Sequence, residues 1–206
     1  MSELILRPSA DYSGSNNYYT QVDDVVSDGS TTTVFAYALG SSDRVYRFYI
    51  PNHNSLIHGG TINKITVVAV CRGIDGDYAT PFIRIGGADD GYNSNQNMSS
   101  GWQSYSAAWT TNPNTSLAWT WNDIDNLIIG VRLQALCSLY VYCTQLYVVV
   151  DYDSVPFVDT DAATNIEETT ATGNGEITDV GVENADKRGI CYNTTGNPLV
   201  TDDKEE

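Results

Sequence analysis

Apolar and polar positions alternate along most of the chain with the two-residue period of β-strands, and a helical period is nearly absent. Tyr46, Phe48 and Ile50, for example, fall on one side of a strand. Arg47 and Tyr49 fall on the other side, which predicts one buried and one solvent-facing surface. The pattern predicts strands over residues 3–7, 18–22, 31–39, 44–50, 61–71, 79–85, 127–135 and 139–150.

Three segments differ from this simple alternation. Residues 61–71 are apolar on both faces in their middle, which predicts a central strand. Residues 86–101 are rich in Asn, Asp, Gly and Ser and predict a long loop, whose length makes it a candidate interaction site. Residues 120–126 predict one short helix, with Thr120 as its N-cap and acids in its first turn.

The spacing of the strands predicts the architecture of residues 1–153. Eight or nine strands over about 150 residues, joined by short turns and one long loop, are typical of a two-sheet sandwich of jelly-roll type. The strands at 31–39 and 44–50 are expected to pair with each other across the turn between them. We therefore predict an all-β fold with a jelly-roll-like sandwich.

A second, acidic β segment is predicted over residues 154–206. The apolar run ends at residues 151–156, and the pattern that restarts at Val158 is Thr-rich, acidic and short-stranded. Its length is well below the ~100 residues and about seven strands of an immunoglobulin-like sandwich, so we expect this segment to be incomplete. The pattern predicts short strands at residues 169–171, 176–178 and 188–192.

Charge is sparse and unevenly placed. Of the 206 residues 17% are charged, and the net charge is −16. Residues 1–150 hold 12 acids and 7 bases, whereas residues 151–206 hold 14 acids and 3 bases. An acidic surface repels phosphate, which argues against nucleic acid as a partner. Because no run of 18 apolar residues and no basic-plus-apolar leader is present, we expect neither a membrane span nor export by a signal peptide.

The four cysteines are Cys71, Cys137, Cys143 and Cys191. None belongs to a CxxC pair, which argues against a zinc site. Each lies in a strand-like run, so buried free thiols are the simplest expectation. A disulfide between Cys137 and Cys143 is the alternative, because the two share strand parity, although the chain would have to reverse between them.

Residues for catalysis are not evident in the sequence. His53 and His58 are the only histidines, and no nucleophile motif such as GxSxG accompanies them. The acids lie mostly in turns, where Asp serves turn geometry, rather than in a pattern that predicts a facing pair. We therefore expect neither an enzyme nor a cofactor.

Two acid–glycine turns are candidates for a cation site. One contributes Asp75 and Asp77, and the other contributes Asp89 and Asp90. Carboxylates in such turns suit a hard cation such as Ca²⁺, although neither turn has the full spacing of an EF-hand loop. A purely structural turn is the alternative for both.

Aromatic residues gather in sequence around the polar loop. Exposed rings stack on the faces of sugars and Asn side chains bind hydroxyls, whereas buried rings fill the ends of a sandwich. We expect core positions for Trp109, Trp119 and Trp121. The candidates for interaction, with a glycan as one possible ligand, are Tyr92, Asn93, Asn95, Trp102 and Tyr105.

Two stretches resemble known families. Residues 4–8, the Thr-Asn-Pro piece at 111–113, the Ala-Trp-Thr piece at 118–120 and residues 124–130 follow one another in an order that resembles a β-sandwich module of phage and prophage structural proteins. This resemblance covers most of residues 1–152. A second set is similar to the front half of a fibronectin-III-like repeat of bacterial surface and phage proteins: residues 163–166, 169–171, 174–177, Gly181 and 187–192.

These resemblances imply a virion component and no chemistry. The first implies a capsid decoration, minor capsid or head-fibre protein at the virion surface. Its partners would be the major capsid protein or another virion protein, and further copies of itself in a homo-oligomer. The second implies a sandwich with open strand edges, which invite pairing with another chain. The alternative is a tail appendage or a cell-surface glycan-binding adhesin, because carbohydrate-binding modules share the fold.

Overall fold

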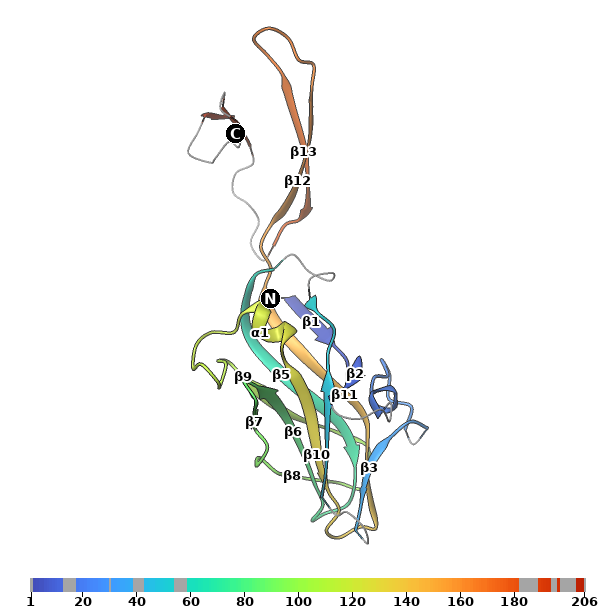
Figure 1. The fold of residues 1–206 in the computed structure, drawn as a ribbon. Coiled ribbons are helices and arrows are strands. Elements are labelled where there is room, and N and C mark those ends of the chain that lie inside the picture. Colours follow the sequence, from blue (N-terminus) through green and yellow to red (C-terminus); the bar gives the residue numbers. More distant parts are fainter. Residues whose placement is uncertain are drawn as a thin grey trace. The chain divides into compact units, whose positions relative to one another are not determined.

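The protein folds into two units built from β-strands (Figure 1). The computed structural model of the chain describes residues 2–12, 18–29, 31–38, 43–53, 59–181, 189–193, 196 and 203–205. One unit comprises residues 1–152 and the other residues 153–206. Antiparallel strand pairs make up the sheets of both units, which confirms the predicted all-β class.

The first unit contains a five-stranded sheet, which we call the β5 sheet. Its order is β1-β11-β5-β9, and β3 also pairs with β11. The predicted central strand is confirmed, because β5 lies between β11 and β9. The bounds are Ser2–Leu6 for β1, Val34–Tyr37 for β3, Thr61–Arg72 for β5, Gln103–Trp109 for β9 and Tyr140–Asp153 for β11.

A six-stranded sheet, which we call the β6 sheet, packs against the first. Its order is β2-β4-β10-β6-β7, and β8 also pairs with β6. The bounds are Ala10–Asp11 for β2, Asp43–Tyr49 for β4, Tyr78–Ile85 for β6, Ala88–Asp90 for β7, Gln96–Asn97 for β8 and Ile128–Gln134 for β10.

The strand order is that of a jelly roll. Going along the chain, β4, β6 and β10 enter the β6 sheet, while β5, β9 and β11 return to the β5 sheet. The first and last strands of the unit, β1 and β11, lie side by side, with Leu6 opposite Val148 (Figure 1). A chain that alternates between two antiparallel sheets in this way encloses one core, and it confirms the predicted two-sheet sandwich.

The core lies between the two sheets. The alternate residues Ile65, Val67 and Ala69 of β5 are fully buried, as are the odd-numbered residues of β10 from Ile129 to Leu133. Complete burial of one such large aliphatic side chain contributes about 1.5–3 kcal/mol. The two-residue period of the sequence is therefore the period of this core.

The segment at residues 18–22 is not the predicted strand. It contains a 3-10 helix, η1 (Tyr18–Gln21). The Asp11 carboxylate accepts hydrogen bonds from the backbone N–H groups of Tyr18 and Tyr19, at 3.0 and 2.8 Å. This local bond to the backbone favours a helical turn over strand pairing.

The expected pairing of the strands at 31–39 and 44–50 is also wrong. β3 pairs with β11, with Phe35 opposite Tyr142, whereas β4 pairs with β10, with Phe48 opposite Ile129. The two strands therefore lie in opposite sheets. The chain passes from one sheet to the other between β3 and β4, so both sheets contribute to the core here: Ala36 of β3 and Phe48 of β4 are both buried.

The polar stretch at 86–101 is more ordered than the predicted loop. Its β7 and β8 segments both pair with β6. Next to it, β9 was not predicted, because Ser and Ala occupy most of its positions. Its inward side still carries Tyr105, which is buried and lies opposite Ala69 of β5.

The predicted short helix is confirmed as α1 (Trp121–Asp125). The Thr120 hydroxyl accepts a hydrogen bond from the Asp123 N–H at 3.2 Å, and the Asp123 carboxylate accepts one from the Thr120 N–H at 2.9 Å. This reciprocal pair is a capping box. The helix buries Ile124.

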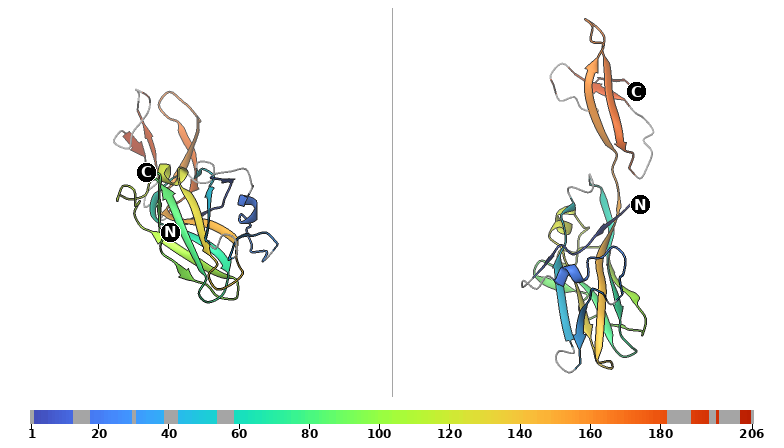
Figure 2. Two further views of the ribbon diagram at one scale, coloured as in Figure 1. Left: turned by 60° about the horizontal axis from the view of Figure 1, so that its bottom comes forward. Right: turned by 90° about the vertical axis from the view of Figure 1, so that its right-hand side faces the viewer.

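The second unit contains two antiparallel strand pairs. β12 (Phe157–Thr164) pairs with β13 (Thr172–Asp179), and β14 (Ile190–Tyr192) pairs with β15 (Asp203–Glu205) (Figure 2). Residues 169–171 lie in the turn between β12 and β13, so the strand predicted there is wrong. Seven of the eight residues of β12 are exposed, so this hairpin buries little apolar surface.

Candidate functional site

One end of the β5 sheet carries aromatic rings on its outer face. Val141 points into the core, so the alternate residues Tyr140 and Tyr142 of β11 point outward. The Tyr140 ring stacks on Tyr37 of β3 at a centroid distance of 5.4 Å and on Tyr142 at 6.0 Å, both at an interplanar angle of 22°. We call Tyr37, Tyr140 and Tyr142 the tyrosine ladder. Phe35 lies beside it, 46% exposed.

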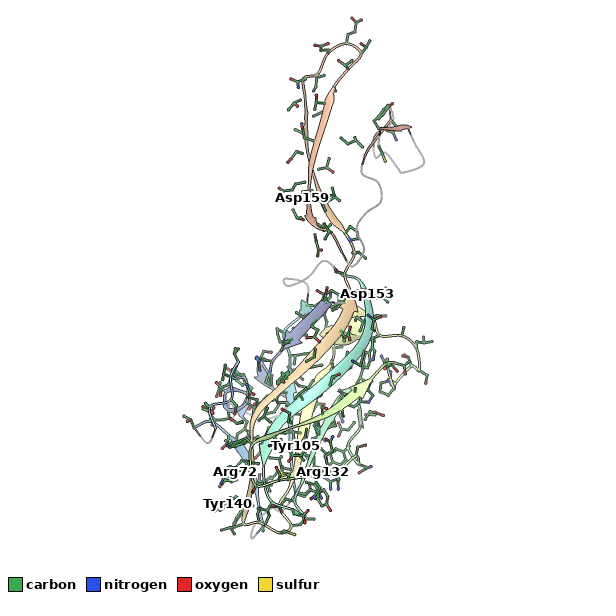
Figure 3. All side chains as sticks on the ribbon, turned by 180° about the vertical axis from the view of Figure 1, so that it is seen from behind. Arg72, Tyr105, Arg132, Tyr140, Asp153 and Asp159 are labelled. Atoms are coloured by element: carbon green, nitrogen blue, oxygen red, sulfur yellow. The ribbon has the colours of Figure 1, made fainter. Side chains whose placement is uncertain are left out.

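The tyrosine ladder borders a shallow pocket of about 300 Å³, which we call the Arg72 pocket. This volume is at the lower end of the range for small-ligand sites, about 300–1,000 Å³. Arg72 and Tyr140 lie close together at this end of the sandwich (Figure 3). The walls are residues 72–74, Ser100, residues 138–140 and Tyr142.

Arg72 supplies the positive charge of the pocket. It is the last residue of β5 and follows the buried Cys71, so its side chain points outward and is exposed. Within the part of the chain that the structure describes, the Arg72 side chain has neither an ion pair nor a hydrogen bond. Among the described arginines only Arg44 shares this lack of a partner, although the chain has 26 acids and 10 bases. The Arg72 guanidinium is therefore available to bind an anion.

The walls of the Arg72 pocket carry no opposing charge. Among the described residues that form them, none is acidic. Arg72 is thus the only charged residue among the described pocket walls, in a protein whose net charge is −16, while the carboxylate of Asp77 lies behind them. An arginine with no acid beside it on the same walls favours a ligand that carries an anionic group.

A buried carboxylate, Asp77, holds two walls of the pocket together. Its Oδ1 accepts hydrogen bonds from the N–H groups of Leu136 and Cys137, both at 2.8 Å, and of Ser138 at 3.1 Å. Its Oδ2 accepts one from the Ile74 N–H at 3.1 Å. Because Ile74 and Ser138 are wall residues, one side chain fixes both walls before any ligand arrives.

These hydrogen bonds also keep Asp77 ionised. Burial by itself raises the pKa of Asp77, but the bonds from Ser138, Cys137 and Ile74 outweigh it, and the pKa lies below its ordinary value. Four amide donors occupy the carboxylate. Asp77 is therefore a structural anion, and this engagement argues against its predicted candidacy as a cation ligand.

The other cation candidates also bind donors of the protein. Asp75 accepts a hydrogen bond from the Asn97 amide, and Asp90 accepts one from the Trp109 indole at 2.5 Å. Asp75 and Asp77 precede β6, whereas Asp89 and Asp90 form the end of β7, beyond the other end of β6. The structure therefore does not bring the four carboxylates together. A cluster of three or more potential metal ligands is absent from the described residues.

Asp89 belongs to a charge cluster on the outer face of the β6 sheet. It binds Arg47 at 2.5 Å and Arg84 at 2.9 Å. Burial raises the pKa of Asp89, but the hydrogen bonds from Arg47 and Arg84 outweigh it, and the pKa lies below its ordinary value. Both guanidiniums are thereby used within the protein.

Tyr92 lies on this same face and is half-buried. Its ring packs edge-on against Phe82 at 5.4 Å, and the Arg132 guanidinium lies 4.9 Å from the ring centre. Arg132 also binds both oxygens of Asp43. Tyr92 therefore covers the fully buried Phe82 ring, and the structure gives it a packing role.

The remaining interaction candidates fall into different settings. Asn95 accepts a hydrogen bond from the Thr80 hydroxyl at 3.0 Å, while Asn93 is exposed. Tyr105 is only 8% exposed, and its hydroxyl accepts a hydrogen bond from the Ser99 N–H at 3.0 Å. The core position of Tyr105 argues against its predicted surface role.

Trp102 lies beside the Arg72 pocket by strand register. The β5–β9 ladder ends with Cys71 opposite Gln103. By the same register, Trp102 lies opposite Arg72, one step beyond the ladder. Trp102 is half-buried and is not a wall residue of the pocket.

The three tryptophans expected in the core all contact it. Trp119 is 4% exposed, and Trp109 and Trp121 are partly buried against the core. Each indole N–H donates a hydrogen bond. Trp109 donates to the Asp90 carboxylate, Trp119 to the Trp109 carbonyl at 3.2 Å, and Trp121 to the Gly60 carbonyl at 2.7 Å.

The cysteines are free thiols, so the alternative disulfide between Cys137 and Cys143 is not formed. Cys143 is buried beside Cys71 of the neighbouring strand β5, and burial together with the Cys143 thiol raises the pKa of Cys71. Cys137 is exposed in the turn before β11, unlike the buried position expected for it. Cys191 is half-buried in β14.

His53 ties its loop to α1. Its N–H donates to the Asp125 carboxylate at 2.9 Å, and its ring Nδ1 lies 2.8 Å from the same oxygen. The ring also stacks on Trp121 at 4.8 Å. His58 lies outside the described residues.

Sequence reasoning missed the residues that form the pocket. Two signals were present in the sequence. Tyr140 and Tyr142 alternate with apolar residues, which places both on the outward face of their strand, and the charged Arg72 stands at the end of an apolar strand. Neither signal shows that β3, β5 and β11 are neighbours, which only the strand order reveals.

The comparisons with known proteins add no further assignment. No protein-family model matches the chain, and no curated protein matches it either. None of the helices among the described residues has the length and apolar character needed to cross a membrane. The function is therefore argued from the sequence, the fold and the geometry.

Proposed function

We propose that the protein is a virion structural protein that acts by binding and assembly, as a capsid decoration, minor capsid or head-fibre component at the virion surface. The proposal gives it no catalytic role. The jelly roll supports this function, because viral capsid and lectin domains commonly use that architecture. The sequence resemblance to phage structural modules supports the same choice.

The observation that carries the proposal is the exposed apolar end of the β5 sheet. Beside the tyrosine ladder, Leu136, Leu139 and Ile74 are 57%, 52% and 41% exposed. Large apolar side chains that are exposed together mark contact sites between proteins. We propose that it docks on the major capsid protein or another virion protein and on further copies of the chain.

The β12–β13 hairpin supports assembly independently. A two-stranded hairpin is marginally stable in water without packing against other elements. This hairpin exposes Val158 at 55%, and Ile166 in its turn is 74% exposed. Its open edges suit strand addition to another chain.

Quantitative mass spectrometry of the source particle tests the virion role. The proposal predicts a simple ratio of copies to the major coat subunit. Absence from purified particles would contradict it.

Light scattering of the purified chain tests the docking surface. Tyr140→Ser is expected to lower the oligomer mass, because it removes the centre of the tyrosine ladder. Tyr49→Ser is the matched control, since Tyr49 is 45% exposed on the other sheet. Equal masses for the two variants would contradict docking through the ladder.

A tail appendage or cell-surface glycan-binding adhesin is the second candidate function. The Arg72 pocket is the specific observation that favours it, because stacked aromatic rings beside polar groups suit a sugar.

A further inference from the structure

We propose that the Arg72 pocket binds a sugar residue that carries a carboxylate, as a terminal unit of a glycan. This inference rests on the glycan-binding candidate function, which is the alternative to protein docking through the same surface, and it deepens that function by naming the ligand class. It involves Arg72, Tyr140 and Tyr142 as the binding groups, and Asp77 as the group that positions the walls.

The tyrosine ladder provides the surface for the sugar ring. Tyr140 and Tyr142 lie nearly parallel, at 22°, and Tyr140 is 39% exposed. Aromatic rings that are fixed by neighbours bind apolar faces with little loss of conformational freedom. The C–H face of a pyranose is such a surface, and the pocket volume of about 300 Å³ suits one ring rather than a long chain segment.

Arg72 provides the selectivity for a carboxylate. A guanidinium and a carboxylate form two parallel charge-assisted hydrogen bonds, which are stronger than bonds between neutral groups. The other arginines on the outer faces show this preference within the protein, since Asp43 binds Arg132 through both oxygens. Arg72 has no such partner among the described residues, and the walls present no acid that would compete with a ligand.

The charge of the chain limits the ligand to a lightly charged one. One guanidinium in a protein of net charge −16 attracts a single anionic group at short range, while a polyanion would be repelled by the remaining surface. A single acidic sugar at the end of an otherwise neutral glycan meets both conditions.

Asp77 makes the site available without rearrangement. The four amide hydrogen bonds to its carboxylate hold Ile74 and Ser138 in place. In addition, the Gly73 N–H donates to the Ser99 carbonyl at 3.1 Å, which fixes the wall that carries Ser100. A site that is already formed does not spend binding free energy on ordering loops.

A matched pair of ligands tests the proposal on the full chain. Methyl glucuronide and methyl glucoside share a ring and differ in the carboxylate, and their dissociation constants are measured by calorimetry or ligand-observed NMR. We expect the glucuronide to bind at least about tenfold more tightly, and its affinity to fall with added salt. Acetate is the third probe and is expected to compete only weakly.

Matched variants identify the residues responsible. Arg72→Gln should abolish the preference for the acidic sugar, whereas Arg44→Gln should keep it, because Arg44 is an equally charged, exposed residue of β4 in the other sheet. Tyr140→Ala should weaken both sugars, and Tyr49→Ala should weaken neither. Circular dichroism confirms that each variant is folded.

The contrary outcomes separate the two levels of the proposal. Equal binding of both sugars would overturn the role of Arg72 and leave the glycan-binding function standing. Binding of neither sugar would overturn both. Acetate that competes as well as the glucuronide would show a general carboxylate site and would overturn recognition of a sugar.

Discussion

Arginines lie beside aromatic rings on both outer faces of the jelly roll, and the two faces differ in how the arginines are paired. On the β6 sheet, Asp89 bridges two arginines and Asp43 binds a third. At the end of the β5 sheet, Arg72 has neither an ion pair nor a side-chain hydrogen bond within the described chain. The same residue types thus form a cluster of paired arginines on the outer face of the β6 sheet, which we call the closed face. On the other face they leave Arg72 unpaired, and we call the pocket there open.

This difference shows why composition alone did not locate the site. Tyr92 belongs to a polar, aromatic stretch, yet its ring covers Phe82 and contacts a guanidinium that is already paired. Arg72 sits at the end of an apolar strand, yet its charge serves no contact in the described fold. A group whose bonding capacity the fold leaves unused is the better indicator of a binding site.

The largest loss of stability is expected for Asp77, the residue that supports the open Arg72 pocket. Asp77→Ala removes the acceptor of four amide groups and should lower the free energy of unfolding by about 2–4 kcal/mol. Urea denaturation measures this value. Asp75→Ala, an exposed carboxylate two positions away, is the control and should stay within about 0.5 kcal/mol. Similar losses in both variants would contradict the structural role of Asp77.

The closed face should respond to overpacking. A Cβ at Gly130 would overlap the Phe82 ring and lie 2.7 Å from the Tyr46 carbonyl oxygen. Gly130→Ala is therefore expected to destabilise the fold by about 1–3 kcal/mol. A double-mutant cycle with Phe82→Leu should recover part of this loss, because the smaller side chain leaves room. Strict additivity in the cycle would show that the ring is not the obstacle.

The closed face also predicts a dependence on pH. The pKa of Asp89 is lower in the folded protein than its ordinary value, so this residue contributes stability above about pH 4 and loses it as the pH falls further. Asp89→Asn should lose less stability between pH 7 and pH 3 than the parent chain, because it cannot be protonated there. Chemical denaturation at the two pH values checks this, and identical losses would contradict the role of the arginine pair.

Much of the fold was predictable because core strands show their period directly. β5, β10 and β11 carry apolar residues at alternate positions, and Thr120 with Asp123 marks the start of α1. β9 was not predictable, since Ser and Ala hide its period. The partners of β3 and β4 were not predictable either, because alternation gives the buried face of a strand but not its neighbour.

The candidate site was predictable only in part. Trp102 was identified from its sequence context and lies near the pocket by register. Arg72 and Tyr140 are 68 positions apart and meet only because β5 and β11 are neighbours. The role of Asp77 depends on the turn before β11, which lies 59 positions away from it and has no pattern that reveals the contact.

The most direct test of the central claim compares Arg72→Gln with Arg132→Gln in urea denaturation. Arg132 binds Asp43 and lies on the Tyr92 ring, so its loss should lower the free energy of unfolding by about 1–2 kcal/mol. Arg72→Gln should change it by less than about 0.5 kcal/mol, because the fold does not use that charge. An equal or larger cost for Arg72→Gln would contradict the account, since it would show that Arg72 serves the fold and is not held free for a ligand.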